Sequence, residues 1–293
     1  MSNTITKAVI PAAGLGTRML PIARAIPKEM LPIVDRPALS YLVEEAAASG
    51  ITDILIITGR GKGAIEDYFD YSPEYDAKLI ASGKQALVDE LHSVCHLANI
   101  SFIRQKETRG LGHAVSCART FVGNDHFVVM YGDDIIFSNV PATRQLIDAY
   151  HRYGLGAAAV KAVPEELVCR YCSLKAEPIP GSDRDWHVTD MIEKPRPEQI
   201  WTNLSILGRV LLPADIFDIL DRTPPGAGGE IQLTDAMRTL AQRDGMTAVD
   251  FEGTRFDLGS KLGLMMANVT RAAEHPEIGE EFRAFLREFA GTL

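Results

Sequence analysis

The stretch AVIPAAGLGTRMLPIARAIPKEMLP, residues 8–32, decides the fold of the N-terminal half of this chain. Its apolar start is typical of a β-strand, and Gly14 and Gly16 follow at once. Because glycine lets backbone N–H groups approach and surround an anion, the pattern predicts an anion-binding loop at the carboxyl end of the first strand. The alternative is an ordinary turn that carries two solvated cations, Arg18 and Lys28.

Two common phosphate-binding motifs do not match this loop. The dinucleotide fingerprint GxGxxG requires a third glycine where Met19 stands, which weakens a nicotinamide dehydrogenase as an interpretation. The Walker A motif GxxxxGK[ST] is absent here and also at residues 59–63, GRGKG. A different kind of anion site is therefore predicted.

The prolines of the loop indicate which kind. Pro21, Pro27 and Pro32 exclude a long helix directly after the turn, so a helix dipole is not the main source of positive potential. Side chains must supply it, with Arg18 as a planar donor fork and Lys28 as a point charge. We predict a stiff loop that carries both cations to a phosphate group.

The rest of the chain predicts an α/β fold with a Rossmann-like mixed, mainly parallel sheet flanked by helices. In the first half, apolar strand-like runs alternate with helical patterns, which is typical of a parallel sheet covered on both faces. Strands are predicted at 8–10, 53–58, 100–104 and 126–131, and helices at 38–49, 62–69, 84–97 and 112–121. After residue 155 helices are fewer, which predicts mixed or antiparallel strands added to the same sheet, with helices at 214–220, 232–243 and 261–273.

We predict one domain over residues 1–293, divided into a half of about 1–155, a smaller lobe of about 156–273 and a C-terminal helix at about 277–290. That helix has an apolar stripe at helical spacing, formed by Phe282, Phe285, Leu286 and Phe289. The stripe is predicted to pack on the body of the protein; a contact between subunits is the alternative.

Composition narrows the partners. The 30 basic and 39 acidic residues give a net charge of -9, which disfavours nucleic acid and anionic membrane surfaces as partners. The sequence has no apolar run of membrane-spanning length, so we expect a cytoplasmic protein. The four cysteines fit a reducing compartment, and the Cys169–Cys172 pair lacks the second pair that a zinc site would need.

Acidic residues follow two of the apolar segments. Asp133 and Asp134 come directly after the strand at 126–131, where open α/β sheets bind ligands, and hard cations prefer carboxylate oxygens. One of the two is a candidate magnesium ligand and the other a cap of the turn; a plain Gly-Asp-Asp turn is the alternative. Asp257, before the helix that begins near Ser260, is a second candidate ligand, and alone it would be interpreted as a helix-start residue.

Two further segments carry polar candidates. Glu193 and Lys194 end a predicted strand before Pro195, and an adjacent acid and base there suit a sugar hydroxyl and a phosphate; a solvated strand end is the alternative. The loop at 224–237, PPGAGGEIQLTDAM, leads into a helix and is able to close over a ligand.

Taken in order, these stretches resemble the bacterial UTP:glucose-1-phosphate uridylyltransferases, within the sugar-1-phosphate nucleotidyltransferase superfamily. The resemblance runs from about residue 7 to the C-terminal helix. Its most specific parts are PAAGLGTRMLP, IPKEMLP, RGLGHAV, EKP, NLSILGR and GAGGEIQLTDAM.

The resemblance implies a role for each candidate. On the nucleotide side, Ala12, Ala13 and Gly14 would form the wall around the nucleoside, Gly16, Thr17 and Arg18 would surround the triphosphate, and Gln105 and Gly110 would recognise the uracil edge. At the reacting phosphates, Lys28 would contact the phosphate groups, and Asp133 and Asp257 would bind Mg²⁺. On the sugar side, Glu193 would bind the hydroxyls, Lys194 would neutralise the sugar phosphate, and Asn203 would lie nearby. The substrates implied are UTP and glucose 1-phosphate, and the products UDP-glucose and pyrophosphate. A homodimer or homotetramer is also implied.

One position departs from the family pattern. In RYCSLKAE, Cys172 stands at the sugar-side strand where glycine is expected, so its thiol either crowds the hexose or points away. The nearest alternative is a glucose-1-phosphate thymidylyltransferase, because thymine differs from uracil by one methyl group. A non-catalytic regulatory subunit of the same fold is another, but it predicts the loss of Lys28, Asp133 or Asp257, and all three are present.

Overall fold

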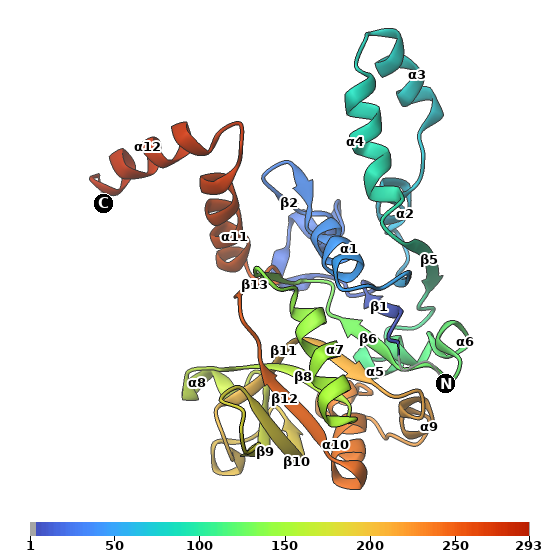
Figure 1. The fold of residues 1–293 in the computed structure, drawn as a ribbon, viewed down its shortest axis with the longest axis vertical. Coiled ribbons are helices and arrows are strands. Elements are labelled where there is room, and N and C mark those ends of the chain that lie inside the picture. Colours follow the sequence, from blue (N-terminus) through green and yellow to red (C-terminus); the bar gives the residue numbers. More distant parts are fainter. Residues whose placement is uncertain (1–3, 293) are drawn as a thin grey trace.

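A nine-stranded sheet forms the centre of the molecule, as seen in a computed structural model that describes residues 4–292 (Figure 1). The strand order is β5-β4-β1-β6-β11-β8-β12-β10-β9. Its strands are β1 (Lys7–Pro11), β4 (Asp53–Thr58), β5 (Asn99–Arg104), β6 (Phe127–Met130), β8 (Ala157–Ala162), β9 (Cys172–Pro178), β10 (Asp185–Glu193), β11 (Leu204–Leu212) and β12 (Met246–Asp250). β10 and β11 run against the others, which confirms the predicted mixed, mainly parallel sheet.

Helices cover both faces of this sheet, which explains why most residues of β1, β4 and β6 are apolar. In β1, Ala8 and Ile10 pack into the core under α1 and α7, whereas Val9 packs into the core under α5, α9 and α10. The helices of the body are α1 (Ala38–Ala48), α2 (Gly63–Phe69), α5 (Leu111–Ser116), α6 (Arg119–Val122), α7 (Ala142–Tyr153), α8 (Glu165–Val168), α9 (Ile216–Leu220) and α10 (Leu233–Asp244). The single helix predicted at 112–121 is thus two short helices.

Two small antiparallel ribbons complete the body. One pairs β2 (Pro32–Ile33) with β3 (Arg36–Pro37), and the other pairs β7 (Asp134–Phe137) with β13 (Thr254–Asp257). The second ribbon places Asp257 directly opposite Asp134. The sequence patterns did not predict this pairing, which joins segments more than 100 residues apart.

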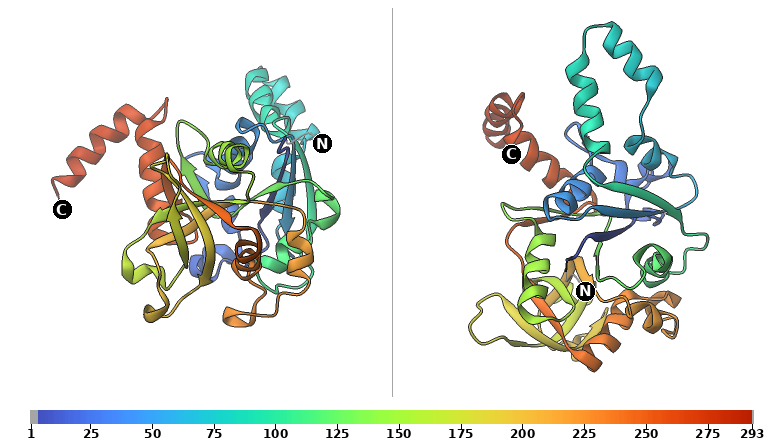
Figure 2. Two further views of the ribbon diagram at one scale, coloured as in Figure 1. Left: turned by 60° about the horizontal axis from the view of Figure 1, so that its bottom comes forward. Right: turned by 45° about the vertical axis from the view of Figure 1, so that its right-hand side comes forward.

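Two helical arms extend from one end of the body (Figures 1 and 2). One is a hairpin of α3 (Pro73–Ala81), which was not predicted, and α4 (Gln85–Cys95), which was. The other consists of α11 (Lys261–Glu274) and α12 (Gly279–Ala290). Across residues 4–292, none of the helices is both long enough and apolar enough to cross a membrane.

The predicted packing of the C-terminal stripe on the body is wrong. α12 points away from the sheet, and Phe285 and Phe289 are 55% and 48% exposed (Figure 2). The reason is local: α11 ends at Glu274 with His275 as its C-cap, Pro276 follows, and the chain leaves in a new direction. Over the residues that the structure describes, the stripe therefore does not pack on the body of the protein.

Candidate functional site

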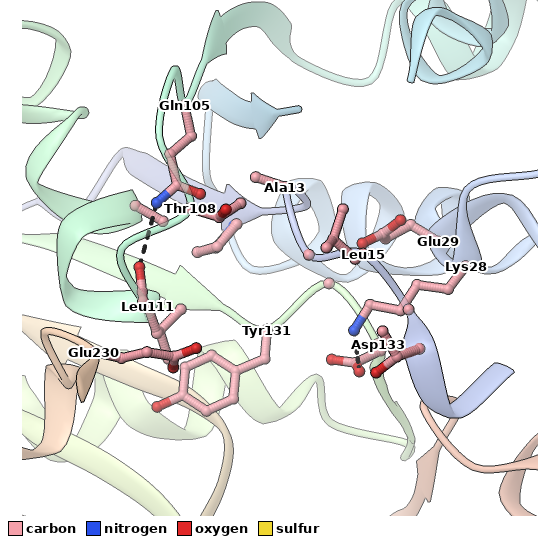
Figure 3. Close-up of a pocket in the computed structure, with 17 residues that line it drawn as sticks. Ala13, Leu15, Lys28, Glu29, Gln105, Thr108, Leu111, Tyr131, Asp133 and Glu230 are labelled. Atoms are coloured by element: carbon pink, nitrogen blue, oxygen red, sulfur yellow. Dashed lines mark hydrogen bonds and ion pairs between the residues drawn. The ribbon is translucent and has the colours of Figure 1, made fainter. Parts of the chain in front are cut away.

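A cavity of about 480 Å³ opens at the carboxyl ends of β1, β5 and β6 (Figure 3). Open α/β sheets bind their ligands at this edge. Eight of the residues predicted from sequence line it: Ala13, Gly14, Gly16, Thr17, Lys28, Gln105, Gly110 and Asp133. Leu15, Glu29, Thr108, Leu111, Tyr131 and Glu230 are also among the lining residues.

The loop after β1 has the predicted conformation. No long helix forms; instead the chain makes three short 3₁₀ turns at Thr17–Met19, Ile22–Arg24 and Lys28–Met30. Ala12 lies beneath the cavity wall, 1% exposed, and its N–H donates to the Ile57 carbonyl at 2.8 Å. The loop is thus fixed at its start to the neighbouring strand β4.

A buried ion pair holds the Lys28 turn in place, and sequence reasoning missed it. The Lys62 ammonium donates to both carboxylate oxygens of Glu29, at 2.9 and 2.8 Å, and to the Ala12 carbonyl at 2.5 Å. Glu29 is 1% exposed. Burial raises the pKa of Glu29 and lowers that of Lys62, and each partner opposes the shift of the other. A lone acid inside the apolar loop IPKEMLP was the available signal.

The cations of the loop face two carboxylates. Lys28 Nζ lies 2.5 Å from Asp133 Oδ2, and the Arg18 guanidinium lies 3.2 Å from Asp257 Oδ2 and 3.8 Å from Asp133 Oδ2. Burial alone would raise the pKa of Asp133 and lower that of Lys28, but charge attraction and hydrogen bonding, mainly between these two groups, together outweigh burial, so the pKa of Asp133 is lowered and that of Lys28 raised. Both groups are therefore charged at neutral pH.

The two carboxylates converge on one point next to Gly259. A Cβ atom built on Gly259 would lie 2.7 Å from Asp133 Oδ2 and 2.9 Å from Asp257 Oδ1. The β7–β13 ribbon causes this convergence, helped by the Leu258 N–H, which donates to the Asp133 carbonyl at 2.8 Å. Asp134 points elsewhere, 2.5 Å from the Arg255 guanidinium; this is an ion pair across the β7–β13 ribbon and not the predicted cap of the turn.

This donor set suits a divalent cation that shares its coordination with a ligand. Within residues 4–292, no cluster of three or more His, Cys, Asp or Glu side chains is arranged to hold a metal by itself. Magnesium is commonly held by one or two carboxylates together with substrate phosphates and water. Asp133 and Asp257 provide that number of carboxylates, beside a loop lined with cations.

The opposite end of the cavity is built by two docked loops. The Ile231 N–H donates to the Arg109 carbonyl and the Gly112 N–H to the Ile231 carbonyl, both at 2.8 Å. Gly110 has a φ of 104° and would collide with Ile231 if it carried a side chain. The docking brings Glu230 to the cavity beside Leu111 and Tyr131 (Figure 3).

The predicted sugar-side residues lie on β9, β10 and the segment before β11, behind Tyr131. Glu193 is opposite Cys172 in the β9–β10 ladder. Burial raises the pKa of Glu193. Burial also raises the pKa of Tyr131, and the nearby Glu193 and Cys172 add to this shift. Lys194 is half exposed, with Nζ 4.0 Å from Glu193 Oε1 and a backbone φ of 46°.

The residues that line the cavity include none of Glu193, Lys194, Cys172 and Asn203, and the last two have other surroundings. Cys172 is 3% exposed, packs in the core, and its sulfur accepts a hydrogen bond from the Ile206 N–H at 3.2 Å. Burial raises the pKa of its thiol to about 12. The thiol therefore points away, the second of the two outcomes expected at this position. Asn203 is exposed, and its carbonyl accepts from the Val163 N–H at 3.0 Å.

The fold, with a cavity that has cations at one end, is typical of α/β proteins that bind nucleotides. A comparison with models of protein families identifies the family. The model described as nucleotidyl transferase matches residues 7–274, so the chain belongs to this family. The uridylyltransferase YngB of Bacillus subtilis strain 168, named a UTP–glucose-1-phosphate uridylyltransferase, is 47% identical over 288 residues, 98% of this chain and 96% of its own.

Solved structures agree with this family. The UTP-bound UDP-glucose pyrophosphorylase of Acinetobacter baumannii is similar with a TM-score of 0.90 and 38% identity, covering 97% of this chain and 99% of its own. A UDP-glucose pyrophosphorylase complexed with UDP-glucose is similar with a TM-score of 0.85 and 38% identity, covering 93% and 100%. The resemblance deduced from the sequence motifs is confirmed.

Proposed function

We propose that this chain transfers a uridylyl group from UTP to glucose 1-phosphate, forming UDP-glucose and releasing pyrophosphate. The observation that carries the proposal is the cavity itself, which has cations and carboxylates at one end and an amide and docked loops at the other. Such an arrangement suits a triphosphate joined to a base. Full-length relatives named for this reaction support it.

The chemistry requires little from the protein beyond position and charge. An oxygen of the sugar phosphate attacks the α-phosphorus of UTP in line with the departing pyrophosphate. This oxygen is already anionic at neutral pH, so no general base is needed, and catalysis comes from alignment and charge neutralisation. We assign Arg18 and Lys28 to the triphosphate and Lys194 to the sugar phosphate, which its half-exposed side chain is free to approach.

Substrate binding follows from the same geometry. Ala13 and Gly14, supported by the buried Ala12, would form the wall around the nucleoside, and Gly16 and Thr17 would present backbone and a small side chain to the triphosphate. Gln105 and Gly110 would contact the base, and Glu193, with Asn203 further out, would orient the sugar. We propose no direct sugar contact for the buried thiol of Cys172.

Asp133 and Asp257 are the proposed ligands of Mg²⁺, which would neutralise phosphate charge during transfer. The Lys28 and Arg18 side chains form ion pairs with the same carboxylates. We expect Asp133→Asn to lower kcat at least about 100-fold, because the loss of one preorganised charge contact raises the activation free energy by about 3 kcal/mol.

The Asp133→Asn experiment has a matched control. Asp148→Asn changes an exposed carboxylate on α7 that does not line the cavity and should leave kcat unchanged. Circular dichroism and thermal unfolding would show that both variants fold. A fully active Asp133→Asn variant would remove Asp133 from the proposed magnesium site.

The reaction is tested by measuring pyrophosphate release from purified protein with Mg²⁺, four nucleoside triphosphates and several sugar 1-phosphates. We expect UTP with glucose 1-phosphate to give the highest kcat/KM. Absence of release with every pair would overturn the proposed function, and a preference for dTTP would favour the thymidylyltransferase alternative.

We further propose that the protein works in the cytoplasm as a homodimer or homotetramer. All four cysteines are free, which suits a reducing compartment. The α11–α12 arm exposes an apolar surface, which we call the arm face: Leu262, Met265, Met266, Val269, Phe285 and Phe289. A second copy would cover this face with an identical one, as two-fold assemblies do.

A further inference from the structure

The side chain of Gln105 is held in one orientation by two acceptors. Its Nε2 lies 3.3 Å from the Gly110 carbonyl oxygen and 2.9 Å from Nδ1 of His113. A carbonyl oxygen only accepts, so the amide atom facing Gly110 must be the nitrogen. Both N–H groups of the amide are then engaged, and His113 Nδ1 acts as an acceptor with its proton on Nε2.

The other end of the amide is left for a ligand. Gln105 lines the cavity and is 6% exposed, and within residues 4–292 no hydrogen bond to its Oε1 is present. Figure 3 shows this oxygen directed toward the side of the cavity on which Ala13 lies. The wall therefore presents a hydrogen-bond acceptor to the base.

We propose that His113 is a positioning residue that determines base selectivity by fixing the Gln105 amide. This inference rests on the proposed function and deepens it. An acceptor at this point pairs with a base that offers a ring N–H, as uracil does at N3. Cytosine has a lone pair at N3, so it would face the Gln105 oxygen acceptor to acceptor, which costs the unmade hydrogen bond of both groups.

His113 fixes the amide more strongly than Gly110 does, because Gln105 Nε2 lies 2.9 Å from His113 Nδ1 and 3.3 Å from the Gly110 carbonyl oxygen. His113 itself does not line the cavity; it lies behind Gln105, beside Cys117 and Arg104. Without its acceptor, the amide is free to rotate and offer its nitrogen to cytosine. A loss confined to one nucleotide is expected only of an orienting residue, since a residue needed for folding affects all nucleotides alike.

The experiment compares kcat/KM for UTP with kcat/KM for CTP in three proteins: wild type, His113→Phe and His113→Asn. Phenylalanine keeps a ring but has no acceptor, whereas asparagine places an amide oxygen close to the position of Nδ1. We expect the UTP/CTP ratio to fall at least about tenfold in His113→Phe, and to stay near the wild-type value in His113→Asn. His113→Ala replaces the phenylalanine variant if that variant does not fold.

The outcomes are distinguishable from failure of the proposed function. If wild type uses no uridine nucleotide, the proposed function is wrong. If wild type prefers UTP and the ratio survives in His113→Phe, or in His113→Ala, with both rates falling in parallel, only the inference about His113 is overturned. A wild-type protein that uses CTP as well as UTP would also overturn it.

Discussion

At the scale of single residues, the ionisation of Glu193 should make the stability of the fold depend on pH. Burial raises its pKa from 4.5, so the stability contributed by its protonated form is fully present below pH 4.5 and is lost as pH rises through the raised pKa. At neutral pH the folded protein therefore holds a poorly solvated carboxylate. We expect Glu193→Gln to raise the Tm at pH 8, and the gain to vanish below pH 4.5, where both side chains are neutral.

Thermal unfolding across this pH range checks the prediction for Glu193. Glu198→Gln, an exposed position in the turn after Pro195, is the matched control and should leave the Tm unchanged at every pH. A Tm gain of Glu193→Gln that is equal at acid and alkaline pH would show that charge burial is not its cause. Kinetic assays of the same variant should show a higher KM for glucose 1-phosphate.

At the scale of elements, the Lys62–Glu29 pair joins the loop after β4 to the turn that carries Lys28. Lys62→Met leaves the Glu29 carboxylate buried without its partner, which should lower the free energy of unfolding by about 3–5 kcal/mol. The double variant Glu29→Gln/Lys62→Met should regain most of that stability but keep a low kcat, because Lys28 is then less firmly placed. Denaturant unfolding and steady-state kinetics measure both; a double variant with wild-type kcat would contradict this.

At the scale of the whole molecule, we propose that the arm face governs assembly. Replacing Phe285 and Phe289 by glutamate should shift the protein from dimer or tetramer to monomer in size-exclusion chromatography with light scattering, because buried like charges would oppose association. The stability of the isolated monomer should not fall, since both rings are about half exposed. An assembly that survives both substitutions must use another surface.

How much the sequence predicts depends on how far apart in the chain the interacting residues lie. The loop from Ala12 to Lys28 was predictable because its glycines, prolines and cations lie within one short segment and each has a local physical effect. The partnership of Glu29 with Lys62 was not, since it depends on β4 returning beside β1. Likewise the sequence made Asp257 a candidate ligand but could not place it opposite Asp134, since that depends on β13 pairing with β7. The stripe of α12 gave a correct helix and a wrong partner, because spacing shows that a face is apolar but not what covers it.

The small gap at Gly259 has a consequence for how the chain tolerates mutation. The φ of Gly259 lies outside the left-handed region, so alanine would meet no backbone penalty there, and elsewhere on a surface such an exchange is nearly silent. Here the added methyl group would occupy the point on which Asp133 and Asp257 converge and would push against Arg18. Alanine, the mildest substitution, would thus block the proposed cation site while sparing the fold. We therefore expect few residues other than glycine to be tolerated at this position.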